Sequence, residues 1–145
     1  MDLRIIADKL GLVYEEVDYF PDDVDSLIIP VDDRVIAVMN LKQSKSRRRF
    51  SLAHEICHYL YHQDRSVLED VQTIDSPLVY DDSVSHKDPY EAEADIFAGE
   101  LLVPLSMLKK VYRPGLTAAD VAHAFDVSEA VASIAMTNHF TALFR

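Results

Sequence analysis

The alternation of apolar and polar positions predicts a small region of mixed helix and strand at the start of the chain. Apolar residues at helical spacing indicate a helix over 2–10, which Gly11 ends. Short apolar runs predict strands over 12–17, 27–31 and 34–41, and the acidic pair before the third run predicts a hairpin between the last two. We therefore expect one helix and a small sheet, whose third strand offers its edge to an extended peptide.

A long helical pattern follows the sheet. Neither glycine nor proline occurs from Phe50 to Val71, and apolar residues recur there at three- and four-residue steps. The basic segment 42–49 is expected to be a solvated loop that enters this helix, with Ser44 or Ser46 as the N-cap. A second interpretation is that one arginine, Arg49, folds back to brace the sheet or an active site.

The rest of the chain predicts a loop and then several helices. Residues 64–87 are polar, contain turn residues and show no clear period, so we expect a loop that shapes a cleft. Asp88 and Pro89 suit the N-cap and the first position of a helix that Pro104 stops. Three further helices are predicted over 105–112, 118–125 and 129–139. The fold class is therefore α+β.

Composition and charge restrict the class of protein. The chain has 145 residues and a net charge of −11, which argues against nucleic acid as a direct partner and favours a basic protein partner. Its single cysteine cannot form a disulfide framework, so we expect a reducing compartment. No signal peptide and no apolar run of membrane-spanning length are visible. We expect a cytoplasmic protein that does not contact a membrane.

The most informative stretch is His54-Glu55-Ile56-Cys57-His58, an HExxH sequence on the long predicted helix. Histidines four residues apart project from one helical face, so both rings can reach one metal ion. Glu55 is poorly placed as a ligand but well placed to accept a proton from a metal-activated water. The sequence therefore predicts a metal held by His54 and His58, with Glu55 as the catalytic base.

A catalytic zinc site needs a third protein ligand. Glu91 and Asp95 share a face of the helix that follows Pro89, so Glu91 can bind the metal while Asp95 accepts the second ring N–H of a ligand histidine. We favour Glu91 over Glu93 and His86 as the third ligand.

Two other nearby candidates are less suitable. His62 lies a full turn beyond His58, too far along the axis to share a metal with His54. Cys57 points to one side of the histidine stripe and is expected to be a core residue. The group that stabilises the oxyanion is left open among Tyr80, His86 and Tyr90.

Two segments together resemble the ImmA/IrrE metallopeptidases of bacteria, phages and mobile elements. The segment 49–58 is similar to the family pattern RxxxAHExxH, and 91–104 is similar to ExxAxxFAxxLLxP. The resemblance covers most of residues 1 to about 140. It implies a small zincin-like domain with one Zn²⁺ per chain, held by His54, His58 and Glu91, and Glu55 as the base. The chain departs from the family at Cys57, where glycine is frequent, and at Val103, where methionine is frequent.

The C-terminal segment 116–141 faintly resembles a helix-turn-helix. Its second helix, 129–139, carries no lysine or arginine, whereas a DNA-reading helix needs cationic or amide side chains. We therefore expect a packing hairpin. Its expected core stripe consists of Val121, Phe125, Val127, Val131, Ile134 and Ala135.

Three functions compete at this point. The first is a zinc endopeptidase (gluzincin-like), and the resemblance implies that it cuts a helix-turn-helix repressor and so relieves repression. The second is a non-catalytic binding or toxin–antitoxin-type module that retains HExxH. A deformylase-like hydrolase is disfavoured, because it expects a cysteine ligand upstream of the motif. We expect one domain over 1–145, with a helix and sheet over 1–49, metal-binding helices over 50–112 and a helical hairpin over 116–141.

Overall fold

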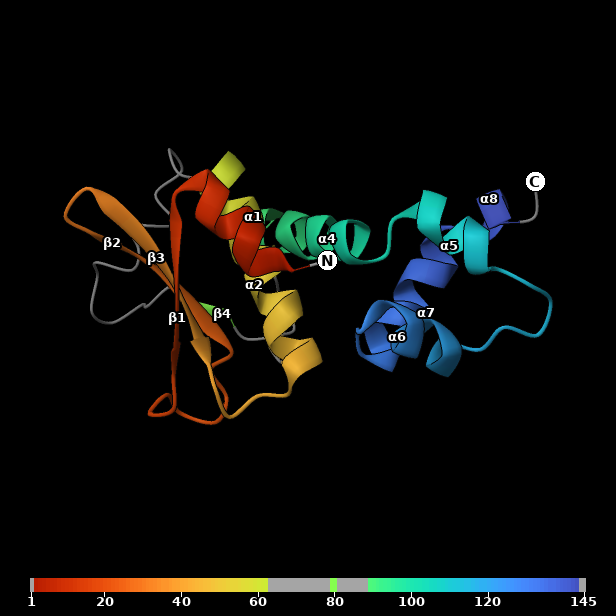
Figure 1. The fold of residues 1–145 in the computed structure, drawn as a ribbon, viewed down its shortest axis with the longest axis horizontal. Helices are drawn as coiled ribbons and strands as arrows, with labels where there is room; N and C mark the ends of the chain where they lie inside the picture. Colours follow the sequence, from red (N-terminus) through yellow and green to blue (C-terminus); the bar gives the residue numbers. More distant parts are fainter. Residues whose placement is uncertain (1, 63–78, 81–88, 144–145) are drawn as a thin grey trace.

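The computed structural model describes residues 2–62, 79–80 and 89–143. The molecule is elongated, with a sheet and its covering helices at one end and a group of short helices at the other (Figure 1). The elements are α1 (Leu3–Leu10), β1 (Leu12–Val17), β2 (Ser26–Val31), β3 (Arg34–Asn40), α2 (Lys45–Tyr61), β4 (Val79–Tyr80), α4 (Pro89–Leu102), α5 (Leu105–Val111), α6 (Ala118–Phe125), α7 (Glu129–Asn138) and α8 (Phe140–Leu143). The α+β class is confirmed.

The sheet has the strand order β1-β3-β2-β4. β1 runs parallel to β3, whereas β2 runs antiparallel to β3 and to β4. The β2–β3 hairpin turns at Asp32, which has a positive φ of 57°, so the predicted hairpin is confirmed. The prediction that the third strand offers a free edge is wrong, because β1 and β2 pair with both sides of β3.

A short strand lies within the stretch that the sequence predicted to be a loop. Val79 and Tyr80 form β4, which pairs with Leu27 and Ser26 of β2. Apart from these two residues, the predicted loop over 64–87 lies outside the described residues. β4 therefore lies beside the beginning of β2, on the edge of β2 that faces away from β3.

The central helix α2 begins at Lys45, directly after the first of the two serines expected to cap it. Ser44 is the N-cap, and its side chain accepts a hydrogen bond from the Arg47 amide. The expected helix entry with Ser44 as the cap is therefore confirmed, whereas the expected solvation is wrong for the three arginines of this turn, whose side chains are 17–27% exposed. Charged side chains can occupy a first helical turn while they point to solvent or to the loops below it.

Two of the arginines in this turn fasten α2 to the sheet. Arg47 pairs with the buried carboxylate of Asp25, which precedes β2. Arg48 donates to the backbone carbonyls of Leu41 and Gln43. These contacts fix the angle at which α2 leaves the sheet.

Arg49 contacts the C-terminal helices. Its guanidinium donates to the carbonyls of Asp126 at 3.1 Å and Phe125 at 3.4 Å. The interpretation that one arginine braces the sheet applies to Arg47 and Arg48, whereas these contacts of Arg49 lie at the end of α6. Arg49 therefore links the start of α2 to the end of α6.

One buried apolar cluster runs through the elements of both ends of the molecule. Its members come from α1, the sheet, α2, α4 and the α6–α7 hairpin, and include Leu3, Ile28, Leu52, Leu102, Val121 and Ala132. α2 packs against β2 and β3, and α4 packs against α2. The helix that carries the HExxH segment therefore lies between the sheet and α4.

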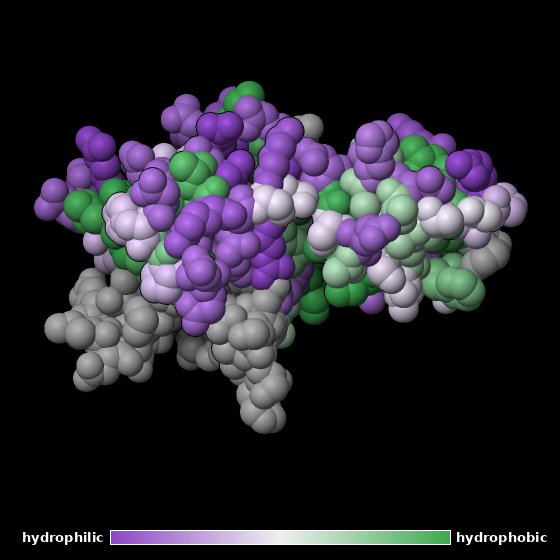
Figure 2. Space-filling view, turned by 90° about the horizontal axis from the view of Figure 1, so that it is seen from below, coloured by the Kyte–Doolittle hydropathy of each residue, from purple (hydrophilic) through white to green (hydrophobic). Residues whose placement is uncertain are grey.

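The C-terminal hairpin follows its predicted boundaries closely. Thr117 and Asp120 form a capping box at α6, and Ser128 caps α7. Ile134 was expected in the core but is 59% exposed, because it lies on the opposite side of α7 from Ala132 and Ala135. Figure 2 shows hydrophilic residues over much of the face at the sheet end and a mixture of hydrophilic and hydrophobic residues over the C-terminal helices. In the part of the chain that the structure describes, no helix is long and apolar enough to cross a membrane.

Candidate metal centre

The middle of α2 is buried along its whole circumference. Every residue from Ser51 to His58 is buried, including both histidines and Glu55 of the HExxH segment. This burial follows from the position of α2 between the sheet and α4. Polar side chains in such a place need specific partners, because an unpartnered buried polar group is costly.

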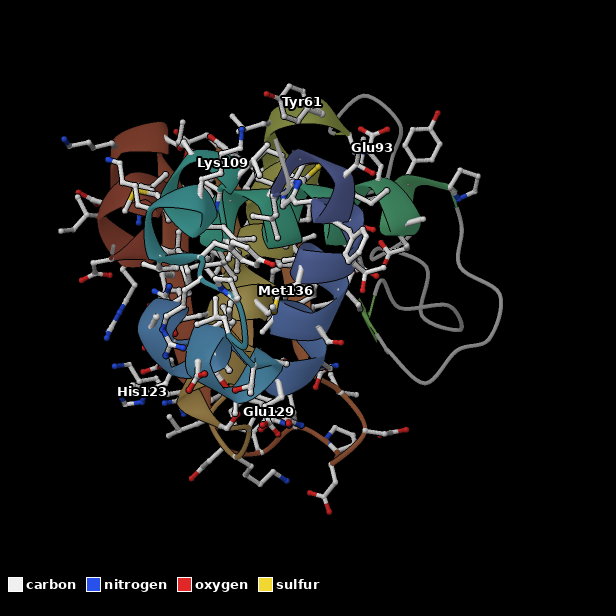
Figure 3. All side chains as sticks on the ribbon, turned by 90° about the vertical axis from the view of Figure 1, so that its right-hand side faces the viewer. Tyr61, Glu93, Lys109, His123, Glu129 and Met136 are labelled. Atoms are coloured by element: carbon white, nitrogen blue, oxygen red, sulfur yellow. The ribbon has the colours of Figure 1, made fainter. Side chains whose placement is uncertain are left out.

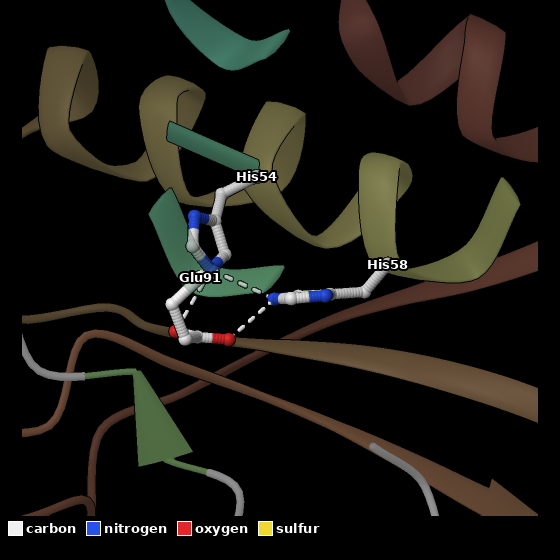
Figure 4. Close-up of side chains that lie close together, drawn as sticks. All are labelled: His54, His58 and Glu91. Atoms are coloured by element: carbon white, nitrogen blue, oxygen red, sulfur yellow. Dashed lines mark hydrogen bonds and ion pairs between the residues drawn. The ribbon is translucent and has the colours of Figure 1, made fainter. Parts of the chain in front are cut away.

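Three ligand atoms converge from α2 and α4 (Figure 4). Nε2 of His54 lies 3.0 Å from Nε2 of His58, and the carboxylate of Glu91 lies 3.3 Å from the first nitrogen and 2.6 Å from the second. Four ligands around a tetrahedral zinc ion lie about 3.3 Å apart, given bonds of roughly 2.0–2.1 Å. The two imidazoles and the carboxylate are therefore spaced as three ligands of one small cation.

The second ring nitrogen of His54 faces Asp95. Nδ1 of His54 lies 2.9 Å from Oδ1 of Asp95, four residues beyond Glu91 on α4. An ionised carboxylate can only accept, so Nδ1 carries the hydrogen and donates it. In the neutral ring, this leaves the lone pair on Nε2, which points toward Glu91 and His58.

The second ring nitrogen of His58 faces another histidine. Nδ1 of His58 lies 2.8 Å from Nδ1 of His62, whose Nε2 lies 3.0 Å from Oε1 of Glu93. If His58 presents a lone pair at Nε2, its Nδ1 donates to His62, and His62 donates to Glu93. His62 does not join the three converging ligands, as the helical spacing predicted, but it orients one of them.

Glu55 lies beside the three ligands and is only 2% exposed. Its Oε2 accepts a hydrogen bond from Oγ of Ser26 at 2.8 Å. Burial raises the pKa of Glu55, while the neighbouring charges of His54 and His58 and the Ser26 hydroxyl oppose this change. A carboxylate with a raised pKa that remains close to a cationic centre is suited to accept and return a proton.

The electrostatics of the three ligands favour a bound positive charge. Burial lowers the pKa of His54, but hydrogen bonds to Asp95 and Glu91 and the charges of Glu55 and Glu91 outweigh it and raise the pKa to about 9. Burial raises the pKa of Glu91, but the two histidines outweigh it and hold the pKa well below its usual range. The donor set, with two imidazoles and one carboxylate, fits zinc.

Sequence reasoning missed two residues of this site. Ser26 is the first residue of β2, and nothing in its local sequence indicates a contact with Glu55, which lies 29 positions later. The role of His62 could have been anticipated, because it follows His58 at the same four-residue spacing. Of the candidates for the oxyanion group, Tyr90 packs edge-on against His62 with ring centroids 4.8 Å apart. His86 and the side chain of Tyr80 lie outside the described residues.

The fold and this donor set define a class of protein in which an HExxH helix and a carboxylate from a second helix form a metal centre. The chain belongs to the Peptidase M78 family, since the family model described as the IrrE N-terminal-like domain matches residues 1–137. This membership supports a metallopeptidase-like domain and a metal cofactor.

A solved structure shares the fold. A Mycobacterium tuberculosis transcriptional regulator superposes with a TM-score of 0.53 at 16% sequence identity, over 89% of this chain and 37% of that chain. The present chain therefore spans little more than a third of the length of that regulator. None of the curated proteins compared with the chain matches it.

Proposed function

We propose that the protein is a zinc-dependent endopeptidase that acts as a single domain. In this proposal His54, His58 and Glu91 hold one zinc ion, Glu55 is the general base, and Asp95 positions His54. The observation that carries the proposal is the buried carboxylate of Glu55 next to three converging ligand atoms. A structural site would need a fourth protein ligand, whereas a catalytic site leaves that position for water and substrate.

Each residue of the site has a distinct part in the proposed hydrolysis. When bound, zinc acidifies water and polarises the carbonyl of the scissile peptide bond. Glu55 accepts the proton that the attacking water loses and delivers it to the leaving amine. Ser26 holds the Glu55 carboxylate in place, while Asp95 fixes the orientation of the His54 ring.

The sheet beside Glu55 supports binding of an extended peptide. Ser26 contacts Glu55 through its side chain and pairs with Tyr80 of β4 through its backbone. β4 is the last strand of the described sheet, so it has a sheet neighbour on one side only within those residues. A substrate that adds to this edge would gain main-chain hydrogen bonds and pass near the proposed base.

We propose a helix-turn-helix transcriptional repressor as the substrate, cleaved to relieve repression. The family membership supports a role in regulation, and the net charge of −11 favours association with a basic DNA-binding protein. The hydrophobic residues exposed on the C-terminal helices, such as Ile134 and Phe140, offer a surface for such a partner. The competing function is a binding module that acts without cleavage.

The substitution Glu55→Gln separates these two functions. The amide keeps the shape of the side chain but cannot accept the proton, so zinc content and fold should be retained while cleavage falls by roughly 100-fold or more. Zinc-loaded wild type and variant would be incubated with the repressor encoded beside the gene, and fragments detected by mass spectrometry. Glu100→Gln is the matched control, because Glu100 is exposed on α4.

The same variants would be compared in cells that carry the repressor and a reporter. Wild type and Glu100→Gln should relieve repression with loss of intact repressor, whereas Glu55→Gln should not. If Glu55→Gln relieves repression as well as wild type while the repressor stays intact, the protein acts by binding and the enzyme proposal is wrong.

A further inference from the structure

A second group of metal-binding side chains lies directly next to the first. Cys57 on α2, His62 at the end of that helix and Glu93 on α4 each offer a ligand atom, and these atoms lie within 4.8 Å of one another. None of the three is among the proposed ligands of the first site. Figure 3 shows Glu93 on the same side of the molecule as Tyr61, which lies in the last turn of α2.

The burial of the three side chains gives the group an inner and an outer part. Cys57 and His62 are each 1% exposed, whereas the side chain of Glu93 is 61% exposed. The thiol of Cys57 and the imidazole of His62 are therefore buried, whereas the carboxylate of Glu93 faces solvent.

We propose that Cys57, His62 and Glu93 form a second metal site, which takes a thiophilic divalent cation such as Zn²⁺. Thiolate, imidazole and carboxylate are the three ligand types that zinc uses in proteins, while the thiolate disfavours Mg²⁺ and Ca²⁺. Nε2 of His62 already points at Glu93, at 3.0 Å from Oε1. Binding releases the thiol proton of Cys57 to solvent.

The contact between His58 and His62 makes the two sites antagonistic, an effect that rests on the proposed first site. Their Nδ1 atoms lie 2.8 Å apart, so one hydrogen can be shared between them. If both rings bind metal through Nε2, each neutral ring must carry its hydrogen at Nδ1, and the two N–H groups meet head-on. A metal in either site therefore weakens binding at the other, and the first site fills first because its three ligand atoms already lie 2.6–3.3 Å apart.

Cobalt titration of the full chain tests this proposal, because the chain has a single cysteine. Thiolate bound to Co²⁺ absorbs in the near ultraviolet, and no other cysteine can produce this band. In wild type the thiolate band should appear only after the first equivalent of Co²⁺ has filled the first site. In Glu91→Gln, which weakens the first site, the band should appear with the first equivalent.

Two variants serve as controls for the ligands. Cys57→Ala should lose the thiolate band but keep the visible bands of Co²⁺ in the first site, and the small side chain suits its buried position. Glu93→Gln alters an exposed residue, so the fold should be retained while the band is lost or needs several more equivalents.

The outcomes distinguish the second site from the proposed enzyme function. A thiolate band together with failure of cleavage would leave the second site standing and reject the function. If folded wild type and Glu91→Gln bind several equivalents of Co²⁺ without a thiolate band, the second site does not exist. His62 and Glu93 would then serve only to orient His58.

Discussion

The environment of Glu55 is set by one hydroxyl from a distant strand. Ser26 is fully buried and donates to the Glu55 carboxylate, which favours the ionised form and opposes the increase in pKa caused by burial. This contact therefore extends the pH range over which Glu55 can act as a base. Ser26, which belongs to no recognisable motif, thus lowers the pKa of Glu55, the residue that the HExxH motif identifies.

Ser26→Ala should shift the acidic limb of the kcat/KM profile to higher pH. Loss of the hydroxyl removes a donor to the carboxylate, so the pKa of Glu55 rises further and the base is protonated over a wider range. The profile would be measured with a cleavable peptide. Ser51→Ala is the control, because its buried hydroxyl has no hydrogen-bond partner among the described residues. An unchanged limb in Ser26→Ala would show that Glu55 does not set it.

Asp95→Ala should weaken zinc binding by roughly 10–100-fold, because the His54 ring loses the acceptor that fixes its orientation. Zinc affinity would be measured by competition with a chromophoric chelator. Glu100→Ala on the same helix should bind zinc as wild type does, since Glu100 is exposed. Equal affinities for Asp95→Ala and Glu100→Ala would remove Asp95 from the site.

At the scale of elements, α2 connects the sheet, α4 and the C-terminal hairpin. Its first turn carries three arginines with separate partners, and its buried middle carries the HExxH segment. The arginines that looked like a solvated cluster in the sequence therefore each fix the helix against a different part of the fold. This explains how a helix with so many charges at its start can hold histidines rigidly a few residues later.

Arg49→Ala should lower the free energy of unfolding by about 1–2 kcal/mol, because two backbone carbonyls at the end of α6 lose a charged donor. Lys45→Ala is the matched control: Lys45 also pairs with Asp126, but its side chain is 76% exposed, so its loss should cost about 0–1 kcal/mol. Urea denaturation of the two variants would measure the difference. Equal losses would mean that the carbonyl contacts of Arg49 contribute nothing.

At the scale of the whole molecule, the proposed metal centre would join α2 and α4, so a bound ion should stabilise the fold. His54 and His58 lie on α2 and Glu91 lies on α4, and 33 positions separate His58 from Glu91 in the sequence. A ligand that binds only the folded state adds about 2.7 kcal/mol when its concentration is a hundred times its Kd. Metal content and stability are therefore linked.

Removal of zinc by a chelator should lower the Tm of wild type, and added zinc should restore it. Glu91→Gln should show little change under the same treatment, because the third ligand is lost. Differential scanning calorimetry at matched protein concentration would measure both. A wild-type Tm that is insensitive to chelation, in protein shown to have lost its zinc, would contradict a metal that bridges α2 and α4.

The sequence by itself determined the elements with strong local signals. Ser44, one of the two serines expected to cap the long helix, does cap α2, and Gly11 ends α1 in a left-handed conformation with a φ of 84°. The alignment of His54 with His58 also follows from helical periodicity alone, because four residues make about one turn. These features depend on residues close together in the chain, so local physics is sufficient to predict them.

Tertiary structure decided the features that depend on distant residues. The central position of β3, the link from Arg49 to Phe125, and the bond from Ser26 to Glu55 each join segments that no local pattern connects. Which strand is paired on both sides, and which polar group reaches a buried carboxylate, are settled only when the sheet and helices pack together. Which groups are buried and which hydrogen bonds form depend on the assembled molecule, so the sequence pattern predicts them only approximately.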